Sequence, residues 1–197
     1  MQREQLVEEI KVLMDLVARK TTSLADSVME IDVDEYIDPT QFQREKTELF
    51  RNYPQFVGPS CILPAPGDYF AFDDTGVPIL IVRQHDGSLK AFVNICSHRG
   101  APLNECDHGH AKKGRMFSCP YHGWTYDLQG KLQGIPFGKE GFGDLDRDAL
   151  GLRPLDVQEK YGMIFVMPNP ELRFSIDDVL GGLQERLCGF GLEDHYY

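Results

Sequence analysis

Two short groups of cysteine and histidine are the residues of this chain best suited to hold a metal. One residue separates Cys96 from His98 and two separate Cys119 from His122, with 20 residues between the groups. Two thiolates and two imidazoles suit a tetrahedral zinc ion. They also suit a [2Fe–2S] cluster in which both cysteines bind one iron and both histidines bind the other. The residue types alone leave both centres open.

The spacing and the setting of the two groups favour the cluster. Zinc ribbons usually draw on pairs with two to four intervening residues, and they often serve domains too small to fold alone. Here one pair has a single spacer, and a β-rich region over roughly residues 60–168 surrounds both pairs. Each pair follows a segment that reads as a strand, AFVNI or RMFS, and precedes a glycine-containing turn. Two β-hairpin loops would present their ligands toward each other in this way.

A second Cys-x-His pattern lies between the two groups, at Cys106 and His108, and His110 follows it. Its segment, NECDHGHAKKG, is polar and charged, and no predicted strand leads into it. We therefore predict that Cys106, His108 and His110 belong to a surface loop between the two ligand hairpins. Their side chains are expected to be solvated or locally packed and not to bind a metal.

Both groups sit inside longer signatures, CSHRGAPL and CPYHGWTYD. These closely resemble the Rieske domain of the Rieske non-haem iron oxygenases, the ring-hydroxylating family, in which Cys-x-His-Arg-Gly and Cys-Pro-x-His-Gly-Trp hold the cluster. The resemblance extends to GDYF, VRQHDGSLKAFVN and DPTQFQREKTELF, so it covers nearly the whole chain. It implies that Cys96 and Cys119 bind one iron of a Rieske [2Fe–2S] cluster, and that His98 and His122 bind the other.

Five neighbours of these residues are predicted to surround the cluster: Arg99, Gly100, Tyr121, Gly123 and Trp124. Gly100 and Gly123 would permit the tight turns after each histidine. Trp124 is expected to pack beneath the cluster loops, with a place on the electron path as the alternative. Arg99 is expected to pair with a nearby carboxylate and cover the sulfides, with an exposed charge at the loop tip as the alternative.

The resemblance also bears on the reduction potential. Rieske proteins of respiratory complexes carry cysteines at the positions of Ala101 and Tyr121, which form a disulfide, and a serine at Trp124, which donates to a sulfide. This sequence has none of these residues. It therefore resembles the lower-potential oxygenase type, suited to a flavin- or ferredoxin-level electron donor.

Short β segments must position the two loops. Eight segments are rich in strand-forming residues and bounded by Gly, Asp and Pro: DYFAF, VPILIVR, LKAFVNI, RMFSC, WTYD, KLQG, RPLDVQEK and YGMIFVM. Asp86–Gly87 predicts a hairpin between the second and third of them. We predict a mainly β fold, an antiparallel Rieske-type domain with N-terminal helices and a C-terminal helix.

Helices are expected on both flanks of the β region. Residues 2–20 predict an amphipathic helix whose apolar face packs on the body or on a neighbouring subunit. A second helix is predicted to begin with Asp38 as its cap and Pro39 at its first position, and to stop before Pro54. A third is predicted to begin at Ser175.

The family's second metal site is not visible in this sequence. In the family a mononuclear iron lies in a C-terminal domain, held by two histidines and a carboxylate. After residue 122 this chain has one histidine, His195. We therefore predict a helical segment at 1–55, the Rieske domain at 56–170, and at 171–197 the start of a catalytic domain that is truncated or absent. Mononuclear Fe(II) is expected only in the full-length family protein.

The resemblance implies one-electron transfer. The chain would be the electron-accepting domain of an oxidoreductase that hydroxylates an aromatic or related organic substrate with O2. A ferredoxin or flavin reductase would donate electrons, a mononuclear-iron catalytic domain would accept them, and full-length subunits would assemble as homotrimers. A stand-alone Rieske-type ferredoxin is the alternative, although such carriers are shorter and lack the helices at 2–53. A structural zinc-binding module is the third reading.

Composition limits the partners and the compartment. The net charge of −11 opposes binding to a phosphate backbone, so no nucleic acid is expected. The apolar runs VPILIV and MIFVM are too short to span a bilayer, and MQREQLVEEI lacks an apolar signal region, so we expect a cytoplasmic protein without a membrane partner. Five cysteines do not suggest a disulfide framework. Cys61 and Cys188 are expected to be buried or half-buried thiols, and His85 to be exposed.

Overall fold

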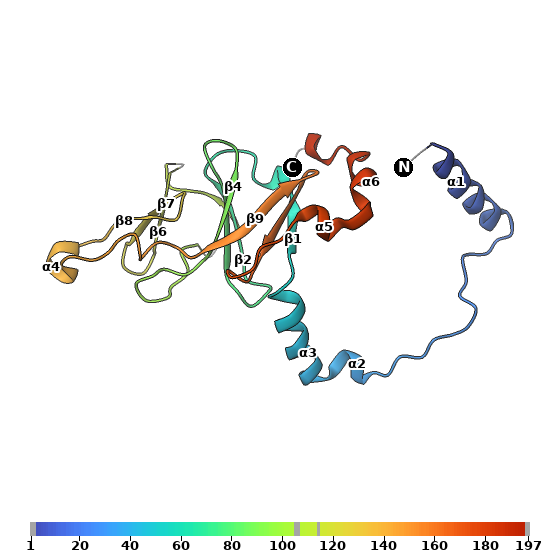
Figure 1. Cartoon of the computed structure of the whole chain (residues 1–197), viewed down its shortest axis with the longest axis horizontal. Coiled ribbons are helices and arrows are strands. Elements are labelled where there is room, and N and C mark those ends of the chain that lie inside the picture. The colour runs from blue at the N-terminus through green and yellow to red at the C-terminus, as the bar shows by residue number, and fades with distance from the viewer. Residues whose placement is uncertain (1–2, 105–106, 114, 196–197) are drawn as a thin grey trace.

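The computed structural model describes residues 3–104, 107–113 and 115–195. Within these ranges ten strands form two sheets, and every strand pairs with its neighbours in antiparallel fashion. The predicted mainly β, antiparallel fold is therefore confirmed. Figure 1 shows the three-stranded sheet, β6–β8, at one end of the body and the N-terminal helix α1 beyond the other side. No helix of the described residues is long and apolar enough to cross a membrane.

The larger sheet has the strand order β1-β10-β9-β4-β3-β2-β5. Its strands are β1 (Gln55–Pro59), β2 (Asp68–Phe72), β3 (Ile79–Arg83), β4 (Leu89–Val93), β5 (His108–His110), β9 (Pro154–Lys160) and β10 (Met163–Met167). Every residue of β3 and of β10 is buried. Their continuous apolar sequences, ILIV and MIFVM, are what strands covered on both faces require.

Strand β3 separates two hydrophobic cores because successive side chains of a strand point to opposite faces. Leu80 and Val82 belong to the core that also contains both candidate ligand cysteines. Ile79 and Ile81 belong to a second core on the other face, with residues of β4, β9 and β10. The segments that carry the two Cys/His groups are thus anchored to one core, and a second core lies on the other face of β3.

The smaller sheet carries the second Cys/His group. Its strands are β6 (Met116–Ser118), β7 (Thr125–Asp127) and β8 (Leu132–Gly134). Phe117 of β6 pairs with Tyr126 of β7, and both side chains lie in the core that contains the cysteines. The β6–β7 connection is therefore a hairpin loop held at its base by buried aromatic rings.

Local signals place the turns correctly. The hairpin predicted at Asp86–Gly87 joins β3 to β4: Asp86 Oδ1 accepts from Ser88 N at 2.9 Å, and Gly87 has a φ of +84°.

Strand β1 was not among the predicted strands, and neither was β5. His108 and His110 lie in β5, which pairs with β2, so the prediction of a loop is wrong for these two residues. Cys106 lies outside the described residues.

The N-terminal helices lie close to the predicted positions, but the packing of the first helix differs from the prediction. Helix α1 (Arg3–Ala18) has no buried residue, and in Figure 1 it stands away from the body, so the predicted packing on the body is wrong. Packing on a neighbouring subunit stays a prediction. After the short helix α2 (Asp34–Ile37), α3 (Pro39–Glu45) begins as predicted, because Asp38 Oδ1 accepts from Thr40 N at 2.8 Å. A π-helical turn, η1 (Lys46–Phe50), continues it and ends before Pro54.

The single C-terminal helix that the sequence predicts is divided into two short helices in the structure. Helix α5 (Ile176–Leu180) begins after Ser175, whose Oγ accepts from Asp178 N at 3.4 Å. Gly181, with a φ of +56°, ends it before α6 (Gln184–Cys188), so a single helix was the wrong prediction. The remaining short elements are 3-10 turns η2 (Ser60–Ile62), η3 (Gly181–Leu183) and η4 (Leu192–Asp194), and helix α4 (Gly138–Phe142), which the sequence did not suggest.

Several single-residue expectations are also decided. Cys61 is half-buried and His85 is exposed, as predicted, whereas Cys188 is exposed and its predicted burial is wrong. The domain boundaries placed at residues 55 and 170 stay predictions.

Candidate metal centre

The two Cys/His groups lie on loops with the same backbone plan, here called loop 1 (residues 96–101) and loop 2 (residues 119–124). In each loop the cysteine N–H donates to the carbonyl five residues on, at 2.8 Å in both. The glycine N–H four residues on donates back to the cysteine carbonyl, at 2.9 Å in loop 1 and 3.0 Å in loop 2. These glycines, Gly100 and Gly123, have φ of +72° and +70°, which only glycine adopts without strain. The predicted tight turns are therefore present, and Cys-x-His and Cys-x-x-His are two versions of one six-residue turn.

The cysteines of the two loops lie together in the interior. Cys96 is 1% and Cys119 is 3% exposed, both are free thiols, and both belong to the same hydrophobic core. Burial raises the pKa of the Cys96 thiol, the hydroxyl of Tyr126 opposes that rise, and the neighbouring Cys119 adds to it. A bound metal cation would supply the charge that this dry site needs to hold two thiolates.

The histidines of the two loops also lie together. The ring centroids of His98 and His122 are 4.6 Å apart, and the ring planes are inclined by 70°. His98 Nδ1 is buried and has no hydrogen-bond partner. A buried ring nitrogen without a partner is costly, and a metal bond would satisfy it. Burial lowers the pKa of His98, and the charges of His122 and Arg99 lower it further, which favours the neutral ring that metals require.

The four side chains form two separate pairs. In the part of the chain that the structure describes, no three Cys, His, Asp or Glu side chains are close enough to share one metal ion. A tetrahedral zinc ion would need all four at a single centre. A [2Fe–2S] cluster needs one pair on each of two irons, with sulfides between them. The arrangement in two pairs therefore fits a [2Fe–2S] cluster with one pair on each iron.

Tyr126 is a further neighbour of Cys96, and it was not among the residues predicted to surround the cluster. Its hydroxyl oxygen lies 3.3 Å from Cys96 Sγ and accepts from the backbone N–H of Ser97 at 3.1 Å. Burial, and then the contact with Cys96, raises the pKa of this phenol, so its proton is retained. With Ser97 as its donor, the phenol is free to donate to the sulfur. The alternation of Trp124, Tyr126 and Leu128 with smaller or polar residues was the signal in the sequence that these three side chains share one face, and all three are buried in the structure.

Rings cover one histidine more than the other. Trp124 is 3% exposed and stacks on His98 with centroids 4.8 Å apart and planes inclined by 6°, so the predicted packing beneath the loops is confirmed. Phe142 of α4, also missed from sequence, meets His98 at 5.6 Å. Tyr121 is 59% exposed and lies against His122 at 3.8 Å.

Arg99 differs from its favoured interpretation. It is exposed, and none of the ion pairs among the described residues includes it. The predicted pairing with a carboxylate is therefore not found in the described residues, and the alternative of an exposed charge at the loop tip holds.

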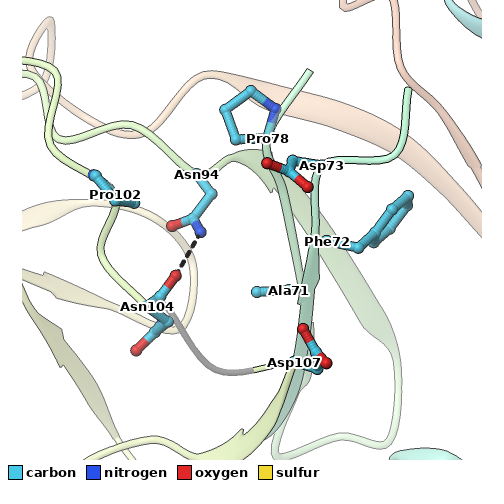
Figure 2. A pocket seen from close by; sticks show the side chains of 8 residues that line it. All are labelled: Ala71, Phe72, Asp73, Pro78, Asn94, Pro102, Asn104 and Asp107. Carbon is cyan, nitrogen blue, oxygen red and sulfur yellow. Dashed lines mark hydrogen bonds between the residues drawn. The ribbon is translucent and has the colours of Figure 1, made fainter. Parts of the chain in front are cut away.

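A polar side chain fixes the segment that follows loop 1. Asn94 Nδ2 donates to the carbonyl of Asn104 at 3.0 Å, and Asn94 Oδ1 accepts from Leu103 N at 3.0 Å. Figure 2 shows the Asn94 side chain directed at Asn104, and both residues line a pocket. The pocket is lined by Ala71, Phe72, Asp73, Pro78, Asn94, Pro102, Asn104 and Asp107. None of the four candidate ligands is among these residues, so the pocket lies outside the candidate metal centre.

The look-alike histidines lie on another part of the surface. His110 Nδ1 is 2.8 Å from Asp68 Oδ1, and the His108 ring lies 4.5 Å from that of Phe70. Both contacts join β5 to β2, so these two histidines are locally packed, as predicted, within a strand pairing.

Comparison with known proteins agrees with this geometry. The family model of the Rieske [2Fe–2S] domain matches residues 54–152. The oxygenase subunit of glycine betaine monooxygenase from Chromohalobacter salexigens is 36% identical over 159 residues, which are 81% of this chain and 34% of that protein. The large oxygenase component of a naphthalene 1,2-dioxygenase system from Pseudomonas aeruginosa is 38% identical over 130 residues, 65% of this chain and 28% of that protein. The chain thus spans about a third of the length of these relatives.

Solved structures show the same likeness. The quaternary ammonium Rieske monooxygenase CntA with L-carnitine has a TM-score of 0.71 and 32% identity, over 79% of this chain and 43% of that chain. Naphthalene 1,2-dioxygenase with indole has a TM-score of 0.64 and 35% identity, over 71% of this chain and 31% of that chain. Since the family model covers half of the chain and the relatives are oxygenase large subunits, the chain belongs to the Rieske [2Fe–2S] domain family and corresponds to the Rieske portion of such subunits.

Proposed function

We propose that Cys96 and Cys119 bind one iron of the [2Fe–2S] cluster, that His98 and His122 bind the other, and that the chain transfers single electrons. The observation that carries the proposal is the buried, partnerless Nδ1 of His98 beside His122. The pair of buried thiols at the base of the same two loops supports it. When bound, the cluster supplies a one-electron couple whose potential the surrounding protein adjusts.

The residues around the cluster serve to hold it still and to limit access. Gly100 and Gly123 shape the loops, and Trp124 fixes the ring of His98. Of the two histidines, His122 is the exposed one, so a redox partner would approach the cluster on its side. Electron transfer requires such proximity and no substrate pocket.

We propose further that the full-length protein is a Rieske oxygenase, in which this domain receives electrons for the hydroxylation of an organic substrate with O2. Its relatives include systems named for naphthalene and for glycine betaine, so an aromatic or a quaternary ammonium compound fits the family. One similar structure, with a TM-score of 0.74 and 31% identity over 82% of this chain and 43% of that chain, is described as a quaternary ammonium Rieske monooxygenase with inter-subunit electron transfer. That description supports electron transfer between the subunits of an assembly. Within such an assembly we propose a ferredoxin or flavin reductase as donor, a mononuclear-iron domain as acceptor, and a homotrimer of full-length subunits.

The ligand assignment is tested by metal and sulfide analysis. The protein should contain two iron and two acid-labile sulfide per chain and should give a Rieske-type EPR signal after reduction. Replacing Cys96 or His122 by Ala should abolish both. Cys61→Ala and His85→Ala, at a half-buried thiol and an exposed imidazole away from the site, are the matched controls and should leave both unchanged. Stoichiometric zinc without sulfide would instead establish the structural zinc module.

The oxygenase role is tested separately from the ligands. A longer reading frame that encodes two histidines and a carboxylate at a mononuclear iron site is expected. If no such frame exists and the reduced protein delivers electrons efficiently to a separate oxygenase, the chain is a ferredoxin.

A further inference from the structure

Three rings surround the imidazole of His98. Trp124 lies parallel to it, at 4.8 Å and 6°, and His122 meets it at 4.6 Å and 70°. Phe142 meets it edge-on, at 5.6 Å and 83°, and is also edge-on to Trp124, at 5.6 Å and 80°. His98, Trp124 and Phe142 thus form an aromatic group in which each ring contacts the other two, in the stacked and edge-on arrangements that aromatic pairs prefer.

The segment that carries Phe142 is held against loop 2. Pro136, just before α4, lies so close to loop 2 that a Cβ added at Gly123 would be 3.2 Å from Pro136 Cγ. Ile135 packs on the core that contains the cysteines. Gly141 N donates to the carbonyl of Phe137 at 2.9 Å, which closes the single turn of α4 and directs Phe142 back toward the metal centre.

The two phenylalanines at the ends of this turn behave differently. Phe137 is 82% exposed and lies outside the aromatic group, whereas Phe142 is 39% exposed and contacts two of its rings. They have the same chemistry and lie on the same turn, and one of them touches a proposed ligand. The contact with His98 therefore distinguishes Phe142 from Phe137, which lies on the same turn.

We infer that Phe142 is a positioning residue for the cluster, an inference that rests on the proposed ligation by His98. Trp124 covers one face of the imidazole but leaves the edge of the ring open to water. Phe142 blocks that edge, so Nδ1 remains directed at the buried side where it has no protein partner. His122 is exposed, and the ring that lies against it, Tyr121, is 59% exposed, more than the 39% of Phe142. The two histidines are consequently inequivalent: His98 is fixed and shielded, and His122 is open.

The test compares Phe142→Ala with Phe142→Tyr, which keeps the ring, and with Phe137→Ala as the matched control. In the reduced protein, the nitrogen hyperfine couplings measured by pulsed EPR should change for one histidine in Phe142→Ala. In Phe142→Ala, the rate at which a chelator bleaches the cluster under anaerobic conditions should rise about tenfold, because two aromatic contacts are lost. Phe142→Tyr and Phe137→Ala should match the original protein in both measurements.

If Phe142→Ala folds but carries no cluster, Phe142→Leu replaces it, because leucine fills the space without a ring. Unchanged couplings and an unchanged bleaching rate in the ring-free variant would overturn the inference. An equal effect from Phe137→Ala would overturn it as well, since the effect would then belong to the turn and not to the contact. An unsubstituted protein without iron and sulfide would instead refute the proposed ligation itself, so the two failures are distinguishable.

Discussion

Replacing Tyr126 by Phe tests how the protein adjusts its cluster. The hydroxyl oxygen of Tyr126 lies 3.3 Å from Cys96 Sγ, and the ring is completely buried in the core. Tyr126→Phe removes one oxygen atom and keeps the ring that packs beside Phe117 and Leu128. The change therefore removes a hydrogen bond to a proposed ligand sulfur with little effect on shape.

The expected change in potential follows from the charge on the sulfur. A thiolate bound to iron accepts a hydrogen bond, and it accepts more strongly after the cluster gains an electron, so the donor stabilises the reduced state. If reduction strengthens the bond by about 1 kcal/mol, the size of a typical net hydrogen bond, its loss lowers the potential by about 40 mV, since 59 mV corresponds to a tenfold change for one electron. Ser97 N–H also loses its acceptor, which costs about 1 kcal/mol of stability.

A potentiometric titration followed by EPR measures the shift, and thermal unfolding measures the stability. Tyr121→Phe is the matched control, because it removes a hydroxyl from an exposed ring that lies against His122 and not against a cysteine. The control should keep the original potential. A Tyr126→Phe potential that is unchanged or higher would refute the assignment of the phenol as a donor to Cys96.

Three further predictions concern stability. Gly100→Ala should lower the free energy of unfolding by about 1 kcal/mol, because alanine is strained at a positive φ. Gly123→Ala should lower it further, because its added Cβ would also meet Pro136, whereas nothing lies within 4 Å of a Cβ at Gly100. Thermal unfolding and cluster content measure the order of the two variants. Glu159→Gln should destabilise the fold by about 2 kcal/mol at neutral pH, since it leaves the nearly buried Arg83 without its carboxylate partner. Deletion of residues 1–33 should change the free energy of unfolding by less than about 0.5 kcal/mol, because helix α1 has no buried residue.

The ion pair of Arg83 and Glu159 also predicts a pH dependence. Burial acts to raise the pKa of Glu159, but its hydrogen bonds with Arg83 and the positive charge of Arg83 outweigh this effect and hold the pKa below the ordinary value of 4.5. A carboxyl group with a depressed pKa stabilises the folded state above its unfolded pKa and loses that contribution as the pH falls through its folded pKa. The stability difference between the original protein and Glu159→Gln should therefore narrow below about pH 4.5. The exposed pair of Arg153 and Glu171 is the control, and Glu171→Gln should show a difference near zero at every pH.

Much of the fold and of the candidate site was predictable because local sequence determines it. The runs ILIV and MIFVM require strands that are buried on both faces, and β3 and β10 are such strands. The two loops depend on Gly100 and Gly123, whose positive φ is a property of the residue type. Asp38 likewise caps α3 through a contact two residues away.

Features that depend on distant partners were not predictable. His108-Gly109-His110 has no strand-forming residue, and it is a strand because it pairs with β2 and because His110 contacts Asp68. Tyr126 reaches Cys96 from 30 positions away in the sequence. The apolar face of α1 predicted a packing partner, and within the described residues this chain supplies none.

The burial of the proposed ligands agrees with electron transfer as the task of the domain. A group that changes only its charge works best when its ligands keep the same positions in both oxidation states, which requires rigid support from surrounding residues. Cys96 and Cys119 are almost completely buried in a core that strand β3 joins to a second core. Trp124 and Tyr126 are buried in the same core and contact His98 and Cys96 respectively. In the proposed set of ligands, exposure of His122 gives a redox partner access to the cluster while the core and the surrounding rings hold the other three side chains.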